Sequence, residues 1–168
     1  MNRCTSPVGS RLVLEARTAA DLMTPNPESL RAAASVPEAV AMLTDRGFSA
    51  APVIDAAGRP VGVLSRTDLL VHEREQTHHA TMSWDADLES PMTPVHQGFS
   101  VEVVDPTRVR DIMTPVVFTV GLHAPAREAV EQMLALKVHQ LFVVDGDCVL
   151  VGVITGLDVL RHCRPVIA

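Results

Sequence analysis

Aromatic residues are scarce in this chain of 168 residues, which contains one tryptophan, four phenylalanines and no tyrosine. Hydrophobic residues nevertheless make up 47% of the sequence. The core therefore has to be built from alanine, valine, leucine, isoleucine and methionine. A chain of this length suits one ordinary domain or two small, tightly packed ones.

Basic runs and long apolar runs are also absent. The formal net charge is −6 and no cluster of lysine or arginine interrupts it, which argues against nucleic acid and anionic membranes as partners. No apolar stretch approaches the roughly 20 residues that a membrane-spanning helix requires. The start of the sequence has no apolar run typical of a signal peptide.

Cysteine is rare, and the three cysteines are Cys4, Cys148 and Cys163. Their number is odd, and no two of them have CxxC spacing. This pattern predicts free thiols in a reducing cytosol, and neither a disulfide framework nor a zinc site. The spacing of His72, Glu75 and His79 would suit a metal patch on one helix face, but an exposed polar face explains it equally well. Since no catalytic constellation is evident either, we expect neither an enzyme nor a metal site.

What the chain does contain is an internal repeat with an offset of 90 residues. Met-Thr-Pro at Met23 coincides with Met-Thr-Pro at Met113, and residues 21–70 match 111–160 at 15 of 50 positions without a gap. A third Met-Thr-Pro, at 92–94, is not followed by the rest of the pattern. We interpret Met-Thr-Pro as the opening of a repeated unit and the third copy as a loop coincidence.

Each repeat predicts the order β-α-β-β-α, and hence an α+β fold. A short helix should end at Met-Thr-Pro, because proline disfavours helix at the residue before it. An extended segment follows, then an amphipathic helix, which in repeat 1 begins with a capping box of Ser35 and Glu38. Two short strands form a hairpin, and a second helix closes the repeat. About 50 residues bury too little surface alone, so we expect the repeats to pack about a pseudo-two-fold axis, with clefts where they meet.

The predicted boundaries are an N-terminal arm at 1–17, repeat 1 at 18–72, a linker at 73–105 and repeat 2 at 106–168. Within the linker, residues 98–104 alternate enough to predict a strand. Asp105 and Pro106 then predict the N-cap and the first position of a helix.

The most informative motif is Ser/Thr-x-x-Asp at the junction of a strand and a helix. Ser65 and Asp68 in repeat 1 recur as Thr155 and Asp158 in repeat 2. One interpretation is a capping box that satisfies the first amides of the helix. The other is a ligand site, because a helix N-terminus attracts phosphate and an adjacent aspartate can accept hydrogen bonds from both hydroxyls of a ribose. Recurrence of the motif at the same position in both repeats favours the interpretation as a ligand site.

The ordered motifs DLMTP…EAV…PVID…GVLSRTDLL and DIMTP…EAV…LFVVD…GVITGLDVL resemble a pair of cystathionine-β-synthase (CBS) domains over about 140 residues. The resemblance implies a module with two clefts for AMP, ADP, ATP or S-adenosylmethionine, and no other cofactor. It assigns the ribose to Asp68 and Asp158. It places the following residues near the rest of the ligand: Ser29, Ser65, Arg66, Thr119, His139 and Thr155.

The two expected clefts differ in charge. Arg66 and His139 would make the Asp68 cleft positive, whereas Ser49 and Gly156 leave the Asp158 cleft without an evident cation. A charged nucleotide is therefore expected at Asp68. The Asp158 cleft should accept adenosine or S-adenosylmethionine nearly as well as AMP, or no ligand at all.

The sequence thus predicts a cytoplasmic regulatory module that senses an adenosyl ligand and modulates an unidentified partner protein. Exposed apolar helix faces predict a homodimer. The alternative is a scaffold or dimerisation module whose clefts are vestigial.

Overall fold

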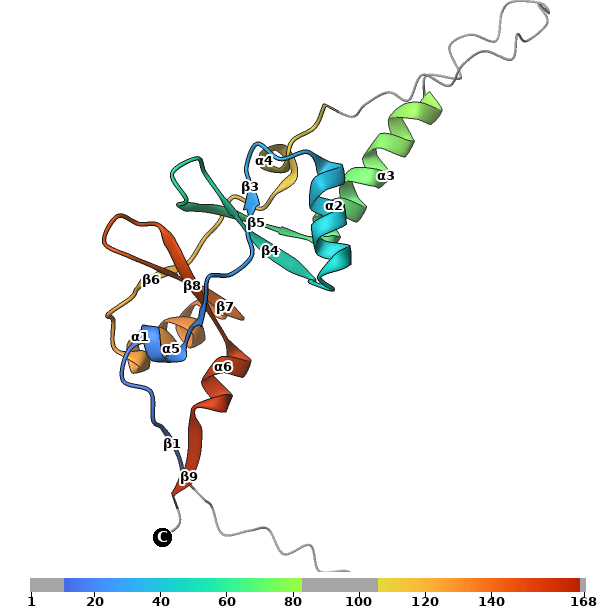
Figure 1. The fold of residues 1–168 in the computed structure, drawn as a ribbon. Helices are drawn as coiled ribbons and strands as arrows, with labels where there is room; N and C mark the ends of the chain where they lie inside the picture. The colour runs from blue at the N-terminus through green and yellow to red at the C-terminus, as the bar shows by residue number, and fades with distance from the viewer. Residues whose placement is uncertain (1–10, 83–105, 167–168) are drawn as a thin grey trace, which may run out of the picture. The chain divides into compact units, whose positions relative to one another are not determined.

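The computed structural model describes residues 11–82 and 106–166, which form two compact units (Figure 1). We name them by the aspartate that each contains. Of the described residues, the Asp158 unit comprises 11–28, 57–60 and 117–166, and the Asp68 unit comprises 29–56, 61–82 and 106–116. Both contain helices and strands, so the predicted α+β class is confirmed.

The Asp158 unit is built on a four-stranded sheet with the order β2-β8-β7-β6. Strands β7 and β8 form the predicted antiparallel hairpin, β6 runs parallel to β7, and β2 lies antiparallel to β8. Figure 1 shows α1 beside α5 in this unit. The bounds are α1 (Ala19–Leu22), β2 (Thr24–Pro25), β6 (Thr119–Gly121), α5 (Ala126–Leu136), β7 (Gln140–Val144), β8 (Leu150–Thr155) and α6 (Gly156–Arg161).

The Asp68 unit has a three-stranded sheet with the order β3-β4-β5, in which β3 is parallel to β4. The predicted continuation of the helix beyond Asp68 is confirmed, since α3 runs for 17 residues. The aliphatic core includes Leu43, Val53 and Leu64, each fully buried. The bounds are β3 (Leu30–Arg31), α2 (Val36–Asp45), β4 (Ala50–Ile54), β5 (Pro60–Ser65), α3 (Arg66–Met82) and α4 (Val109–Ile112).

A separate two-stranded antiparallel ribbon joins β1 (Arg11–Leu14) to β9 (Cys163–Val166). Leu12 pairs with Pro165 and Leu14 with Cys163. The sequence predicted no element in the N-terminal arm, because a four-residue strand with exposed side chains carries little periodicity.

The segments that open the two repeats are exchanged between the units. Residues 19–25, at the start of repeat 1, belong to the Asp158 unit, where Thr24 pairs with Val153 of β8. Residues 109–116, at the start of repeat 2, belong to the Asp68 unit, where Thr114 makes the equivalent bridge to Val63 of β5. The repeats of the sequence and the compact units of the structure therefore divide the chain differently.

Each exchanged segment is held by a methionine that lies over a glycine of the sheet. A Cβ at Gly152 would lie 2.9 Å from Met23 Cγ and closer still to its sulfur. A Cβ at Gly62 would lie 2.6 Å from Met113 Sδ and 2.8 Å from the Thr114 carbonyl oxygen. The Met-Thr-Pro and Val-Gly-Val motifs of the repeat thus fit one another, each across the repeat boundary.

The start of α2 agrees with the prediction from the sequence, whereas the start of α4 differs from it. Glu38 accepts the backbone N–H of Ser35 at 2.7 Å and its hydroxyl at 2.8 Å, which confirms the capping box and lowers the pKa of Glu38 below its usual range. The predicted helix start at Pro106 is wrong. Helix α4 begins at Val109 with Arg108 as its N-cap. The predicted strand at 98–104 and the third Met-Thr-Pro lie outside the described residues.

We predict that Gly152→Ala and Gly62→Ala each destabilise the fold by about 1–3 kcal/mol through overpacking. Met23→Ala should relieve part of the cost at Gly152, because the atoms nearest the added methyl belong to the Met23 side chain. Met113→Ala should relieve less at Gly62, where the backbone oxygen of Thr114 remains. Two double-mutant cycles by urea denaturation measure the couplings. Equal coupling energies for the Gly152–Met23 pair and the Gly62–Met113 pair would contradict this prediction.

Candidate functional site

Asp158 is only 6% exposed and lies in the first turn of α6. Its Oδ2 accepts the backbone N–H of Thr155 at 2.8 Å and the Thr155 hydroxyl at 2.5 Å. The Asp158 N–H in turn reaches Thr155 Oγ1 at 3.3 Å. The predicted pair Thr155 and Asp158 is therefore brought together as a capping box.

Asp68 makes the same arrangement with Ser65 at the start of α3. Its Oδ2 accepts the Ser65 N–H at 2.7 Å and the Ser65 hydroxyl at 2.6 Å. Asp68 is half-buried, in contrast to Asp158. The capping interpretation therefore describes both pairs, although their surroundings differ.

In both aspartates, capping uses one carboxylate oxygen and leaves the other for different contacts. Oδ1 of Asp158 is approached by Thr24 Oγ1 at 3.4 Å and by Arg161 at 3.5 Å, both long for a hydrogen bond. Oδ1 of Asp68 accepts no hydrogen bond from the described residues. A carboxylate oxygen can accept two hydrogen bonds, so the capping and ligand-binding interpretations of the motif are compatible.

The surroundings of the two aspartates differ in charge. Asp68 opens on a groove of about 240 Å³, whose other lining residues are Val71, His72, Glu75, Asp111 and Ile112. At the positions equivalent to Val71 and His72, Asp158 has Arg161 and His162. The groove at Asp68 is therefore rich in carboxylates, while a guanidinium lies beside Asp158. Sequence reasoning missed Asp111, because the exchange of opening segments was not visible in the repeat. It also missed Arg161, although the spacing of three residues from Asp158 places both on one helix face.

Arg66 does not line the groove that contains Asp68. Its Nη2 donates to the carbonyl oxygen of Leu43 at 3.3 Å, and its side chain borders a second groove, of about 260 Å³, between α2 and α3. The rest of that groove is mostly apolar, with the lining Val40, Leu43, Thr44, Leu69, Leu70 and Glu73.

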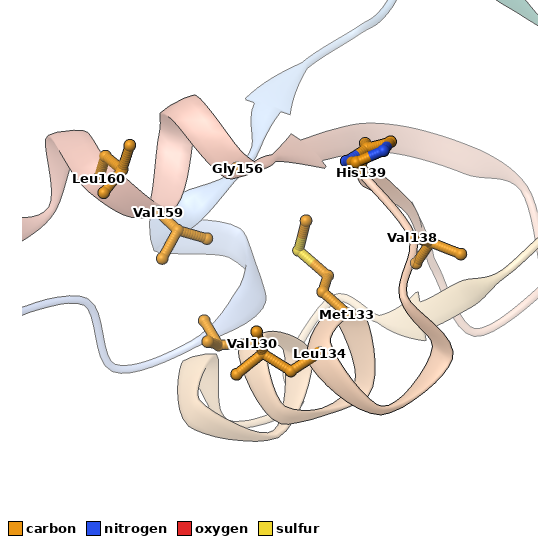
Figure 2. A pocket seen from close by; sticks show the side chains of 8 residues that line it. All are labelled: Val130, Met133, Leu134, Val138, His139, Gly156, Val159 and Leu160. Carbon is orange, nitrogen blue, oxygen red and sulfur yellow. The ribbon is translucent and has the colours of Figure 1, made fainter.

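His139 borders the equivalent groove of the Asp158 unit, which has about 270 Å³ and lies between α5 and α6 (Figure 2). Figure 2 shows Met133 rising from α5 into this space, with Leu160 on the opposite helix. The remaining lining is Val130, Leu134, Val138, Gly156 and Val159. A role for His139 opposite Asp68 stays a prediction.

Ser29 and Thr119, which are equivalent in the repeat, are not brought next to the aspartate of their own unit by any described contact. Thr119 opens β6, which β7 separates from β8. Ser29 immediately precedes β3 in the Asp68 unit. Their contribution to a ligand site therefore stays a prediction.

No three His, Cys, Asp or Glu side chains within 12–76 and 106–166 are arranged to hold a metal ion. None of the helices within 11–82 and 106–166 is long and apolar enough to span a bilayer.

The family model of the CBS domain matches this chain twice, at residues 19–75 and 109–164. These ranges cover most of both repeats, so the family likeness rests on the whole pattern rather than on one motif.

Individual proteins are similar over most of the chain. The CBS domain-containing protein CBSX2 of Arabidopsis thaliana, a chloroplastic protein, is 29% identical over 151 residues, which are 86% of this chain and 62% of the relative. The structure of CBSX2 in complex with AMP has a TM-score of 0.62 at 27% identity, and covers 87% of this chain and 95% of that one. The cytosolic domain of the Mg²⁺ channel MgtE in complex with ATP gives 0.61 at 28% identity, with 88% and 49% covered.

We predict that Asp158→Ala destabilises the fold by about 1–3 kcal/mol, because it leaves the half-buried N–H and hydroxyl of Thr155 without their acceptor. Asp68→Ala, at the half-buried site, should cost about 0.5–2 kcal/mol, as loss of a helix cap does. Asp→Asn at either position should cost less than Asp→Ala, since the amide oxygen can still accept the capping bonds. Guanidinium denaturation of the four variants measures these differences. The capping role is contradicted where the asparagine and alanine variants are equally destabilised.

Proposed function

The chain belongs to the CBS domain family, and we propose that it is a regulatory module that binds an adenosine-containing ligand and modulates a partner protein. AMP, ADP, ATP and S-adenosylmethionine are the candidate ligands. The module itself catalyses no reaction in this proposal. A cytosolic location remains part of the proposal, and rests on the pattern of cysteines.

The proposal rests on the different contacts of the two carboxylate oxygens of each aspartate. A side chain that served only as a cap would need one oxygen, and Oδ2 fills that role in both units. Oδ1 of Asp68 and Asp158 can accept a ribose hydroxyl without loss of the cap. The same geometry at two positions 90 residues apart supports two ligand sites rather than one.

Similar proteins support the ligand class. Two similar solved structures are complexes with an adenine nucleotide, CBSX2 with AMP and the MgtE cytosolic domain with ATP. Both ligands contain adenosine, whose ribose offers the two hydroxyls that an aspartate can accept. The number of phosphates differs between them, so the shared part of the ligand is the nucleoside.

Regulation requires two states of the module that differ in affinity for the ligand. A ligand shifts such an equilibrium only by its differential affinity for the two states. The partner protein would then recognise the state that the ligand favours, and by linkage the partner would change ligand affinity by the same factor.

Self-association through the two apolar grooves is also part of the proposal. The grooves between α2 and α3 and between α5 and α6 occupy equivalent positions in the repeat. Leu70 and Leu160 are equivalent residues on their rims and are 65% and 64% exposed. Apolar surface of this kind in both units is typical of an interface between protein chains, and we propose a second copy of this chain as the occupant.

The ligand sites are tested by isothermal calorimetry with AMP, adenosine and GMP. We expect AMP and adenosine to bind the wild type and GMP not to bind. Asp68→Asn and Asp158→Asn should each reduce affinity at its own site at least tenfold, because a charge-assisted hydrogen bond of about 1.5–3 kcal/mol is lost while the cap is kept.

Glu131→Gln is the matched control for loss of one negative charge, since Glu131 is exposed and paired with Arg127 on α5. It should bind like the wild type. The regulatory proposal fails, and the scaffold alternative gains, where no adenosyl ligand binds the wild type at millimolar concentration.

For the dimer, we predict a particle of twice 18.1 kDa by light scattering at micromolar concentration. Leu160→Glu should return it to 18.1 kDa by placing a charge in the interface. Leu157→Glu is the control, because Leu157 is 56% exposed on the same helix but does not line the groove. A monomeric wild type, or dissociation by both variants alike, would contradict an interface at this groove.

A further inference from the structure

The Asp158 carboxylate is contacted by a residue from the opposite repeat. Thr24 belongs to the Met-Thr-Pro that opens repeat 1, and its hydroxyl donates to Asp158 Oδ1 at 3.4 Å across 134 residues of sequence. Antiparallel pairing of β2 with β8 aligns Thr24 with Val153 and so brings the hydroxyl to the start of α6. The contact reaches the oxygen that capping leaves for a ligand.

The equivalent threonine of repeat 2 makes the same backbone pairing without the side-chain contact. Thr114 donates its N–H to the Val63 carbonyl at 2.9 Å and accepts the Val63 N–H at 3.0 Å. Within the described residues, its hydroxyl makes no hydrogen bond to Asp68. The backbone bridge alone therefore does not require a threonine hydroxyl on the aspartate, and the contact at Asp158 is specific to one site.

We infer that Thr24 is a positioning residue for the ligand site at Asp158, and that occupancy of this site is coupled to docking of the exchanged segment 19–25. This inference rests on the proposed function. The Thr24 hydroxyl orients Oδ1, while a ligand hydroxyl would take the second lone pair of that oxygen in place of Arg161. Arg161, released from its 3.5 Å contact, would then be available to the phosphate of a ligand.

Ligand binding and docking of segment 19–25 are coupled because both involve the same oxygen, Asp158 Oδ1. A ligand that binds better when Thr24 holds Oδ1 must, by linkage, stabilise the docked segment by the same factor. The Asn26 N–H reports docking directly, since it donates to the Val151 carbonyl at 3.0 Å just beyond the paired residues. Slower hydrogen exchange at Asn26 in the presence of ligand is therefore the signature of this coupling.

The experiment uses the full chain with Asp68→Asn as background, so that only the Asp158 site reports AMP binding. Thr24→Val removes the hydroxyl and keeps the side-chain shape, and we expect AMP affinity to fall about threefold to tenfold. Thr24→Ser should restore binding to within about twofold of the background, because it restores the donor. Thr114→Val is the matched control and should leave affinity unchanged.

Hydrogen exchange distinguishes positioning from a purely structural role. AMP should slow exchange at Asn26 in the background protein and in Thr24→Ser, but not in Thr24→Val. Equal affinity of Thr24→Val and the background, or equal losses in Thr24→Val and Thr114→Val, would overturn the inference while the proposed function stands. AMP binding to the wild type but not to the Asp68→Asn background would also overturn it. Failure of the wild type to bind any adenosyl ligand would overturn the proposed function, and the inference with it.

Discussion

Two methionines, each packed over a glycine of a neighbouring strand, hold the opening segment of each repeat on the sheet of the other. Met23 over Gly152 and Met113 over Gly62 leave no room for even a methyl group between segment and sheet. The backbone bridges of Thr24 and Thr114 and the contact of Thr24 with Asp158 all depend on this close approach. A single packing constraint thus sets both the architecture of each unit and the surroundings of one candidate site.

The sequence predicted well what local patterns control. Hairpin β7–β8, the capping box at Ser35 and the helix α3 that follows Ser65 can all be predicted from periodicity, turns and capping residues. The actual start of α4 at Val109 was missed because capping at Arg108 uses its backbone N–H, a group that every residue except proline carries. The β1–β9 ribbon was missed because its partners are separated by most of the chain.

The exchange of opening segments could not be predicted from the repeated sequence pattern. Because Met23 and Met113 match each other, as do Gly62 and Gly152, either segment fits either sheet by pattern alone. The choice is made by tertiary structure. Hence Asp111, whose place beside Asp68 depends on that choice, was not recognised as a neighbour of a candidate site. Arg161 was missed although its spacing of three residues from Asp158 on one helix is local. The Ser/Thr-x-x-Asp pairs were recognised, because they are local.

The exchange also has a consequence for synthesis on the ribosome, where chains emerge at about 5–20 residues per second. The described elements of the Asp68 unit are complete once residue 116 has emerged, whereas β2 in the Asp158 unit has to wait for β8, at 150–155. For several seconds, Met23 and its short segment have no native partner. Closing a loop of more than 100 residues carries an entropic penalty and slows folding. A nascent chain therefore acquires the Asp68 unit first, and Asp158 enters its final surroundings last.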